Sequence, residues 1–173
     1  ATSSSEPGEY EVTVSGAEAQ NYAITYEAGT LTIVEADAVT LTAQSYTITY
    51  GDVLPEFDFT SEGAAVDGTP SITCEATSAS PVGTYPIVIT KGSVTNYNDH
   101  YVNGTLTIEK APLTISGGTY TMKQGEELPA FTASYTGFKN DETEDVLITK
   151  PTLTTEATSS SEPGEYEVTV SGA

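Results

Sequence analysis

The chain has 173 residues, with 25 Asp and Glu against five Lys and no Arg, and a formal net charge of −20. Five scattered lysines cannot form the basic patch that nucleic acid or an anionic membrane surface requires, so both are excluded as partners. No apolar run approaches the length of a membrane span, and a single cysteine excludes an internal disulfide framework.

The main signal is an internal repeat. Residues 1–17 recur without a single change at 157–173, so the long period is 156 residues. A shorter, weaker repeat lies inside it: Val39–Phe57 resembles Leu113–Phe131. Because repeats of this kind mark modular arrays, we expect two types of module to alternate, the A repeat and the B repeat.

The repeats divide the chain into three parts. Residues 1–35 are the C-terminal part of a B repeat, 36–110 a complete A repeat, and 111–173 the N-terminal part of another B repeat. The B repeat is longer than the A repeat, and the extra length falls within Gly137–Leu147. Short linkers such as Glu109–Pro112 predict that consecutive repeats are held in a limited range of angles.

Alternation of apolar and polar residues predicts half-buried β-strands with one wet face. In chain order, the apolar sets are Tyr10/Val12/Val14, Tyr22/Ile24/Tyr26, Leu31/Ile33, Tyr46/Ile48/Tyr50, Tyr85/Ile87/Ile89, Leu106/Ile108 and Tyr166/Val168/Val170. Because the tyrosines share these positions with Ile, Val and Leu, we expect them in the core rather than exposed for stacking on sugars.

Turn residues separate the expected strands. Reversals are predicted at Gly51-Asp52, Pro81-Val82-Gly83, Asn103-Gly104, Gly117-Gly118 and Pro163-Gly164. Asn103-Gly104, between Tyr101-Val102 and Thr105-Leu106, is typical of a β-hairpin. A single helical turn is expected within Asp141–Leu147, with Asn140 as its N-cap.

These elements predict an all-β fold. Six or seven short strands per 75–80 residues fit tandem small antiparallel β-sandwich (Ig-like) or β-grasp-like modules in an extended array. Periodicity does not choose between the two topologies.

Several motifs of the A repeat carry a family resemblance. Tyr46 and Tyr50-Gly51 precede Leu54-Pro55 and Phe57, and the segments Gly83–Ile87, Asn96-Tyr97 and Gly104–Ile108 follow. This order resembles the MBG repeats of bacterial surface proteins, although the B repeat departs from it at Lys123-Gln124-Gly125. The resemblance implies a stalk, fibre or adhesin repeat at the cell surface or outside the cell, and it carries no active site.

Catalytic or metal-binding clusters are scarce. One histidine, His100, and one cysteine, Cys74, cannot build a usual zinc site, and we expect an exposed loop histidine and a packed thiol. Without a nucleophile and base the chain is not expected to be an enzyme or to need a cofactor. Lys91 and Lys150 are weak candidates for an isopeptide bond to asparagine.

An acidic loop in the B repeat could bind calcium, because Ca²⁺ prefers several hard oxygen ligands. The candidate ligands are Asp141, Glu142, Glu144 and Asp145. They lack the spacing of an EF-hand, so a solvated charged loop is the competing interpretation.

Together these features predict a structural repeat of an extracellular bacterial fibre, stalk or filament. Its partners would be adjacent repeats of the same chain or copies of itself. The alternative is an adhesin module that binds glycan, mucin, or a host or partner-cell receptor. We expect the sequence to be a window on a longer chain; otherwise residues 1–35 of one molecule could complete the B repeat of the next by strand addition.

Overall fold

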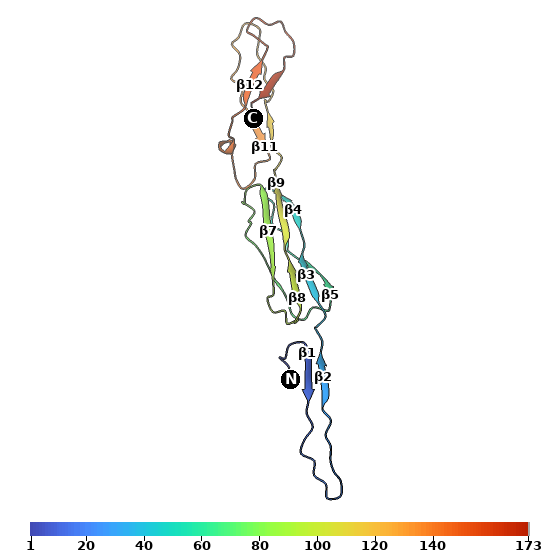
Figure 1. Cartoon of the computed structure of the whole chain (residues 1–173). Helices are drawn as coiled ribbons and strands as arrows, with labels where there is room; N and C mark the ends of the chain where they lie inside the picture. The colour runs from blue at the N-terminus through green and yellow to red at the C-terminus, as the bar shows by residue number, and fades with distance from the viewer. Residues whose placement is uncertain (173) are drawn as a thin grey trace. The chain divides into compact units, whose positions relative to one another are not determined.

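The structure is a computed structural model that describes residues 1–172, and it is all-β as predicted. The described residues form several small sheets and one single-turn helix (Figure 1). The chain divides into two compact units. Unit 1 comprises Ala1–Gln44, Asp58–Thr73 and Val88–Asn103, and unit 2 comprises Ser45–Phe57, Cys74–Ile87 and the chain from Gly104 onward. These units follow contacts rather than sequence repeats, so the boundaries of the A and B repeats stay a prediction.

Unit 1 contains a hairpin and a three-stranded sheet. The hairpin pairs β1 (Gly8–Val12) antiparallel with β2 (Gly29–Ile33). In the sheet, β3 (Val39–Ala43) lies between β5 (Phe59–Gly63), its antiparallel partner, and β8 (Asp99–Val102), its parallel partner. The buried side chains of unit 1 are aliphatic: Val39, Leu41, Ala43, Ile89 and Val94.

The larger sheet has four strands in the order β4 (Tyr46–Thr49), β9 (Gly104–Glu109), β7 (Gly83–Thr90) and β6 (Ser71–Cys74). All of β4 and β9 belong to unit 2. The central strand β9 pairs parallel with β4 and antiparallel with β7. The buried side chains of unit 2 are Ala76, Ile87, Leu106 and Ile108.

The rest of unit 2 is built from shorter elements. β10 (Thr114–Ser116) pairs antiparallel with β11 (Ser134–Thr136), and β12 (Thr152–Thr155) with β13 (Val168–Ser171). The helical turn η1 covers Glu144–Val146. No hydrophobic side chain of 111–172 is fully buried, in contrast to the A repeat.

Equivalent strands of the two repeats keep the same register. Thr40 faces Glu62 in the A repeat, and the equivalent Thr114 faces Thr136 in the B repeat. A glycine with positive φ stands at the end of each second strand: Gly63, at 95°, is the last residue of β5, and Gly137, at 119°, directly follows β11. A Cβ at either glycine would collide with a backbone carbonyl, that of Ala38 or that of Pro112, so only glycine fits both turns.

The sheets differ from the expected antiparallel modules. Each sheet of the A repeat contains one parallel pair, β3–β8 or β4–β9, and is therefore mixed. The predicted Asn103-Gly104 hairpin is wrong, because β8 and β9 pair with different strands of different sheets. Asn103 instead accepts a hydrogen bond at Oδ1 from the backbone N–H of Ile89, 3.1 Å away. Whether the modules are sandwiches or grasp-like folds stays a prediction.

Three further expectations need correction. The tyrosines are half-buried or exposed rather than core residues, and several phenol oxygens hydrogen-bond near the surface, as Tyr10 and Tyr85 do to backbone carbonyls. The strand expected at residues 22–26 does not form. In the A repeat the equivalent strand is β8, which pairs with β3, and residues 1–35 contain no equivalent of β3. The helical turn exists, but its N-cap is Thr143, while Asn140 lies in the left-handed region at φ 53°.

Candidate functional site

The tip of the A repeat is a tight turn that follows β4. We name Tyr50-Gly51-Asp52 the A tip. The Asp52 N–H donates to the Thr49 carbonyl (3.0 Å), and the Thr49 N–H donates to Asp52 Oδ2 (3.2 Å). Gly51 takes φ 85°, a value that side chains disfavour. Because the Tyr50 N–H also donates to the Glu109 carbonyl (2.8 Å), the turn is fixed on the end of β9.

The A tip contacts the extra segment of the B repeat. We name Gly137–Leu147 the B loop. Tyr50 Oη donates to Glu142 Oε1 at 2.7 Å, and Lys139 Nζ lies 3.2 Å from Asp52 Oδ1. A Cβ on Gly51 would come within 2.5 Å of Lys139 Cβ, so the glycine also permits this close approach. The two repeats therefore share a specific polar contact within unit 2.

The charge pair at this contact is partly exposed. The hydrogen bond from Lys139 lowers the pKa of Asp52, and the Thr49 N–H adds to this effect. The side chains of Lys139 and Asp52 are 36% and 45% exposed. Because solvent screens exposed ion pairs, the pair fixes the geometry of the contact more than it stabilises the fold.

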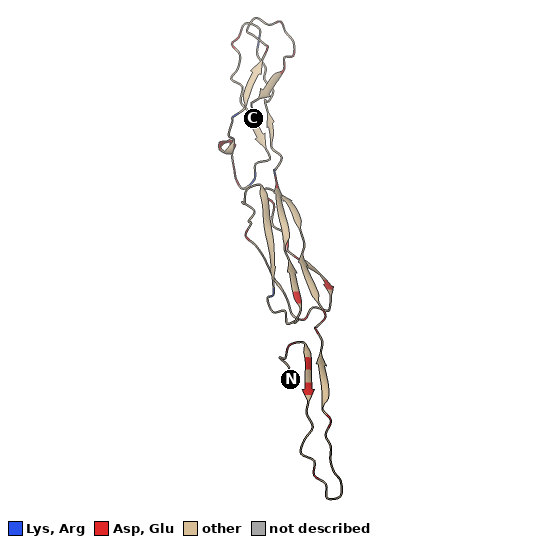
Figure 2. Cartoon of the chain, in the orientation of Figure 1, with Lys and Arg blue, Asp and Glu red and all other residues tan. Residues whose placement is uncertain are grey.

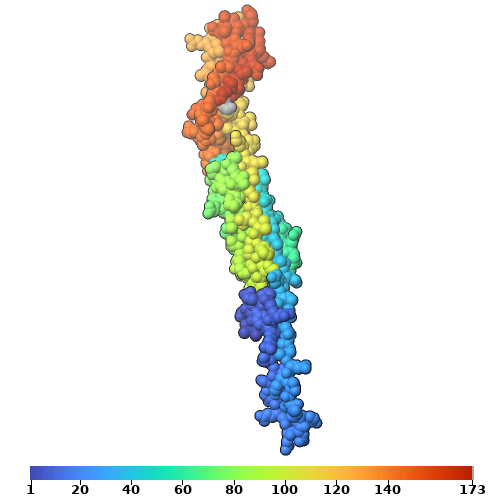
Figure 3. All heavy atoms as spheres, in the orientation of Figure 1, coloured from blue at the N-terminus to red at the C-terminus, as the bar shows by residue number. Residues whose placement is uncertain are grey.

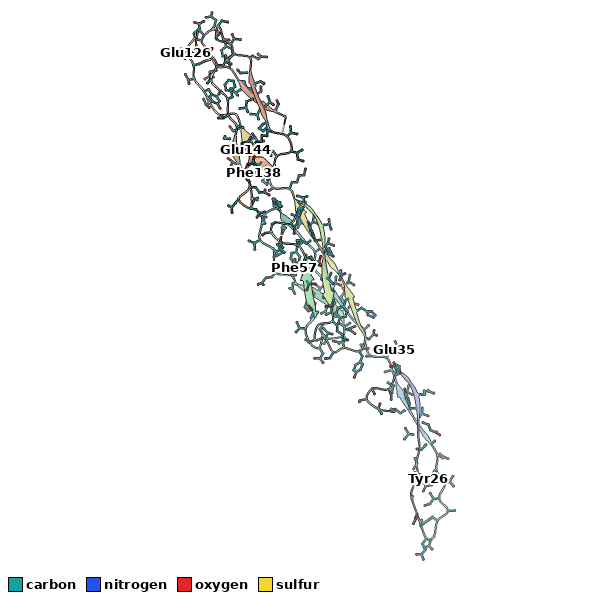
Figure 4. All side chains as sticks on the ribbon, turned by 90° about the vertical axis from the view of Figure 1, so that its left-hand side faces the viewer. Tyr26, Glu35, Phe57, Glu126, Phe138 and Glu144 are labelled. Carbon is teal, nitrogen blue, oxygen red and sulfur yellow. The ribbon has the colours of Figure 1, made fainter. Side chains whose placement is uncertain are left out.

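A pocket of about 620 Å³ lies beside the contact. Its lining is mainly apolar and includes Leu113, Phe138, Leu147 and Ile148. Phe138, labelled in Figure 4, also packs on Tyr135 with ring centroids 5.6 Å apart. The polar part of the lining includes Tyr50, Lys139 and Glu142, which are residues of the contact itself.

The predicted calcium ligands lie in the B loop but have different partners. Glu142 binds Tyr50, whereas Glu144 and Asp145 lie 3.3 and 3.5 Å from Lys150 Nζ. Asp141 takes a positive φ of 58° and lies at the surface. Within residues 1–172, no group of three or more His, Cys, Asp or Glu is placed to hold a metal ion. The calcium site stays a prediction.

The other candidate residues are held in strands and ion pairs. His100 is an exposed residue of β8, and Cys74 is a half-buried free thiol at the end of β6. Lys91 Nζ lies 2.9 Å from Asp99 Oδ2, and its side chain is 54% exposed. Lys91 and Lys150 therefore pair with carboxylates, not with the asparagine side chains that an isopeptide bond would need.

The tip of the B repeat has the same turn in a different setting. We name Gln124-Gly125-Glu126 the B tip. The Glu126 N–H donates to the Lys123 carbonyl (3.0 Å), the Lys123 N–H donates to Glu126 Oε2 (2.9 Å), and Gly125 has φ 89°. No atom lies within 4 Å of a Cβ built on Gly125. The Gly125 N–H donates to the Ser159 carbonyl at 2.8 Å, so the B tip, where Figure 4 labels Glu126, has a backbone partner although the space beside the glycine Cα is open.

A second hollow runs along the B repeat. This B groove has a volume of about 690 Å³. Its two walls are the stretches Tyr120–Met122 and Gly164–Val168, with Phe131 among the residues of its lining. Tyr120 and Phe131 meet edge to face, 5.0 Å between centroids, as Tyr46 and Phe57 do at 5.7 Å in the A repeat.

Sequence reasoning identified the A tip as a turn and the B loop as an insertion, but it did not join them. A signal was present in the sequence, because Lys139 and Glu142 lie in the segment that the A repeat lacks. Lys139 is opposite in charge to Asp52, and Glu142 can accept a hydrogen bond from Tyr50. The B groove was not anticipated, because a groove of this kind shows only where strand partners are known.

A comparison with known protein families gives a match over most of the chain. The MBG domain (YGX type) matches residues 1–32, 39–107 and 113–173, and the A tip has this Tyr-Gly-X composition. The comparisons with curated proteins and with solved structures gave no match. The part of the chain that the structure describes contains no helix long and apolar enough to cross a membrane. Because the matched segments span nearly all of its length, the chain belongs to the MBG domain family of the YGX type.

Proposed function

We propose that the chain is a structural, non-catalytic repeat of an extracellular bacterial fibre, stalk or filament. Family membership supports this proposal, because MBG domains occur in bacterial surface proteins. The net charge of −20 also suits such a role, since like-charged surfaces keep neighbouring chains soluble. Figure 2 shows acidic residues on β1, β5 and β8, so the charge is not confined to one strand.

The observation that carries the proposal is the contact between the A tip and the B loop. Two side-chain interactions, Tyr50–Glu142 and Asp52–Lys139, join residues about 90 positions apart in the sequence. The linker Glu109–Pro112 is too short to allow wide movement once these interactions form. Modules fixed in this way would keep a constant orientation from one to the next, which a fibre or stalk requires.

Nuclear magnetic resonance can test this coupling. Residual dipolar couplings measured for the A repeat and for the B repeat are expected to fit one alignment tensor in the unmodified chain. The double variant Tyr50→Phe, Lys139→Ala removes both interactions, so the two repeats should then need separate tensors. Lys123→Ala at the B tip serves as the control and should leave one tensor. Independent tensors in the unmodified chain would contradict a fixed series of modules.

A second function, adhesion, is favoured by two exposed tyrosines at equivalent positions. Tyr22 and Tyr97 follow an asparagine in each repeat, and their side chains are 81% and 87% exposed. Exposed aromatic rings suit stacking on sugars or protein surfaces. Binding to a glycan array that disappears in Tyr97→Ala but persists in Val53→Ala, a change at another exposed apolar residue, would support the adhesin; an array without hits would not.

A further inference from the structure

Two turns of the A repeat contact the same part of the B loop. One is the A tip, and the other is Thr77–Ser80, which is closed by a hydrogen bond from the Ser80 N–H to the Thr77 carbonyl (3.0 Å). The carbonyl of Ser78, inside this second turn, accepts from Nδ2 of Asn140 at 3.3 Å. Figure 3 shows the B loop, in orange, against the green surface to which this turn belongs. We name the A tip and Thr77–Ser80 together the A socket.

The B repeat shows the same tip and turn bonded directly to each other. The stretch Glu75–Ser80 is equivalent to Glu156–Ser161, and both end in the same hydrogen-bonded turn. In the B repeat the Gly125 N–H donates to the Ser159 carbonyl at 2.8 Å. The equivalent carbonyl of the A repeat, that of Ser78, bonds to the B loop instead. The B loop thus takes the place of a direct bond between tip and turn.

Three residues of the B loop make one contact each with the A socket, and each contact has a different chemistry. Lys139 brings a cation to Asp52, and Glu142 brings a hydrogen-bond acceptor to the hydroxyl of Tyr50. Asn140 brings an amide donor to the carbonyl of the second turn. The A socket therefore presents a carboxylate, a hydroxyl donor and a carbonyl acceptor, which fit a cation, a carboxylate and an amide in this spacing.

The contacting stretch Lys139–Glu142 is itself a tight turn. The Glu142 N–H donates to the Lys139 carbonyl at 3.0 Å, and the two central residues, Asn140 and Asp141, have φ values of 53° and 58°. Asparagine and aspartate enter this left-handed region more readily than other side chains. Because the turn brings Lys139 and Glu142 to the same tip, its backbone conformation and its side chains act as one recognition element.

The A repeat has a different loop at the equivalent position, residues 64–70, which we name the A loop. It begins with Ala64-Ala65-Val66, where the B repeat has Phe138-Lys139-Asn140. Its one carboxylate, that of Asp67, accepts from Thr95 Oγ1 at 2.6 Å within the A repeat. The A loop therefore offers a socket of this kind no cation and no amide, and its carboxylate already has a partner.

We propose that the A socket selects the module that follows an A repeat: it accepts a module with a B loop and rejects a module with an A loop. This inference rests on the proposed function and adds a rule for the order of modules. An A loop would leave Asp52 without its cation and the Ser78 carbonyl without its amide, and specificity arises from such unpaired groups. Because the Asp52–Lys139 pair is partly exposed, it contributes more to selectivity than to affinity.

Exchange of the loop within the full chain tests this selection. Residues 138–151 are replaced by the sequence of 64–70, so that the second module carries an A loop. Residual dipolar couplings of the two repeats should then need separate alignment tensors instead of a common one, because the contacts of the A socket are lost. A common tensor in the exchanged chain, with β12 and β13 still formed, would overturn the proposal.

Substitutions in the turn Lys139–Glu142 give a second test, which does not depend on the folding of the exchanged chain. Lys139→Glu with Asn140→Asp reverses a charge and replaces the amide donor by a carboxylate, while aspartate still permits the left-handed turn. This double variant should need separate tensors. The matched control, Lys139→Arg with Asp141→Asn, retains the cation and the amide and should keep a common tensor. The same result in both proteins would overturn the proposal, while the proposed function would still stand on the common tensor of the unmodified chain.

Discussion

The segments Gly29–Ile33 and Gly104–Ile108 have one sequence and two environments. Leu106 is fully buried, whereas Leu31 is 45% exposed. The difference lies in the number of strand partners, two for β9 and one for β2. An alternating pattern thus specifies which face of a strand is apolar, but neighbouring strands decide whether that face is buried.

The repeated segment 1–17 leads to the same conclusion. In its first copy Gly8–Val12 forms β1 against β2, whereas in its second copy the strand is Val168–Ser171 against β12. Each copy forms the strand for which a partner is present in its unit. In the A repeat both pairings occur together, because β7 lies between β9 and β6. The same residues can therefore pair with two different strands, and the partners present in each unit decide which pairing forms.

The largest expected effect separates the two leucines. Leu106→Ala removes a fully buried side chain and should lower the free energy of unfolding by about 3 kcal/mol. Leu31→Ala should lower it by less than about 1 kcal/mol, because the side chain is already half in water. Urea unfolding followed by tyrosine fluorescence, at a concentration low enough to keep the chain monomeric, measures both.

Equal losses from the two substitutions would break the comparison. They would mean that Leu31 is buried in the free chain and that β2 already has a second partner.

The two tips provide the next comparison. Gly51→Ala combines an unfavourable positive φ with a clash against Lys139, and should lower the free energy of unfolding by about 2 kcal/mol. Gly125→Ala has the same φ penalty in open space and should cost about 1 kcal/mol. The double variant Gly51→Ala, Lys139→Gly relieves the clash and is expected to recover part of the difference. Thermal unfolding of the four proteins checks this order.

Much of the fold could be predicted from the alternation of residue types. The all-β class, the repeated strands and the glycine turns follow from local patterns that survive in both repeats. The parallel pairs could not be predicted, because Asn103-Gly104 looks like a hairpin turn and only long-range pairing shows that β8 and β9 separate. Tyr46 and Tyr85 share the pattern of Ile and Val, yet they remain half-buried, since pattern alone does not place a hydroxyl.

The candidate site was predicted only in part. The turn at Gly51 was expected from its residues, and the acidic character of the B loop was clear. What the sequence lacked was distance information: Glu142 was a candidate calcium ligand, and the structure places it on Tyr50 instead. A carboxylate in an acidic run can accept a phenol proton donor or a cation with equal ease, so composition does not distinguish these partners.

A smaller effect is expected from the hydroxyl at the A tip. Tyr50→Phe removes the hydrogen bond to Glu142 and should lower the free energy of unfolding by about 1 kcal/mol. Gln124 occupies the equivalent position of the B tip, where Gln124→Ala should have almost no effect. Chemical denaturation of the two variants measures the difference. Equal effects would show that the A tip gains nothing from the B loop.

The smallest effect concerns pH and compares the A repeat with residues 18–35, where Ile24 replaces Asp99. Tyr101 Oη donates to Asp99 Oδ2 at 2.5 Å, and this bond, followed by that from Lys91, lowers the pKa of Asp99. The carboxylate therefore adds stability above its usual pKa of 3.8, and this contribution is lost as the pH falls through the lower folded value. Burial and Asp99 raise the pKa of Tyr101 to about 12, so the contribution of the protonated phenol to stability is fully present below its usual pKa of 10.0 and is lost as the pH rises through about 12. In Asp99→Asn, tyrosinate absorbance should show Tyr101 ionising at a lower pH. The variant should also lose a smaller part of its neutral-pH stability as the pH falls, because residue 99 no longer takes up a proton. Asp67→Asn, which loses a bond from Thr95 instead, should leave the tyrosine titration unchanged. An unchanged titration in Asp99→Asn would mean that burial alone holds the Tyr101 proton, and that the carboxylate distinguishing the A repeat at this position has no part in it.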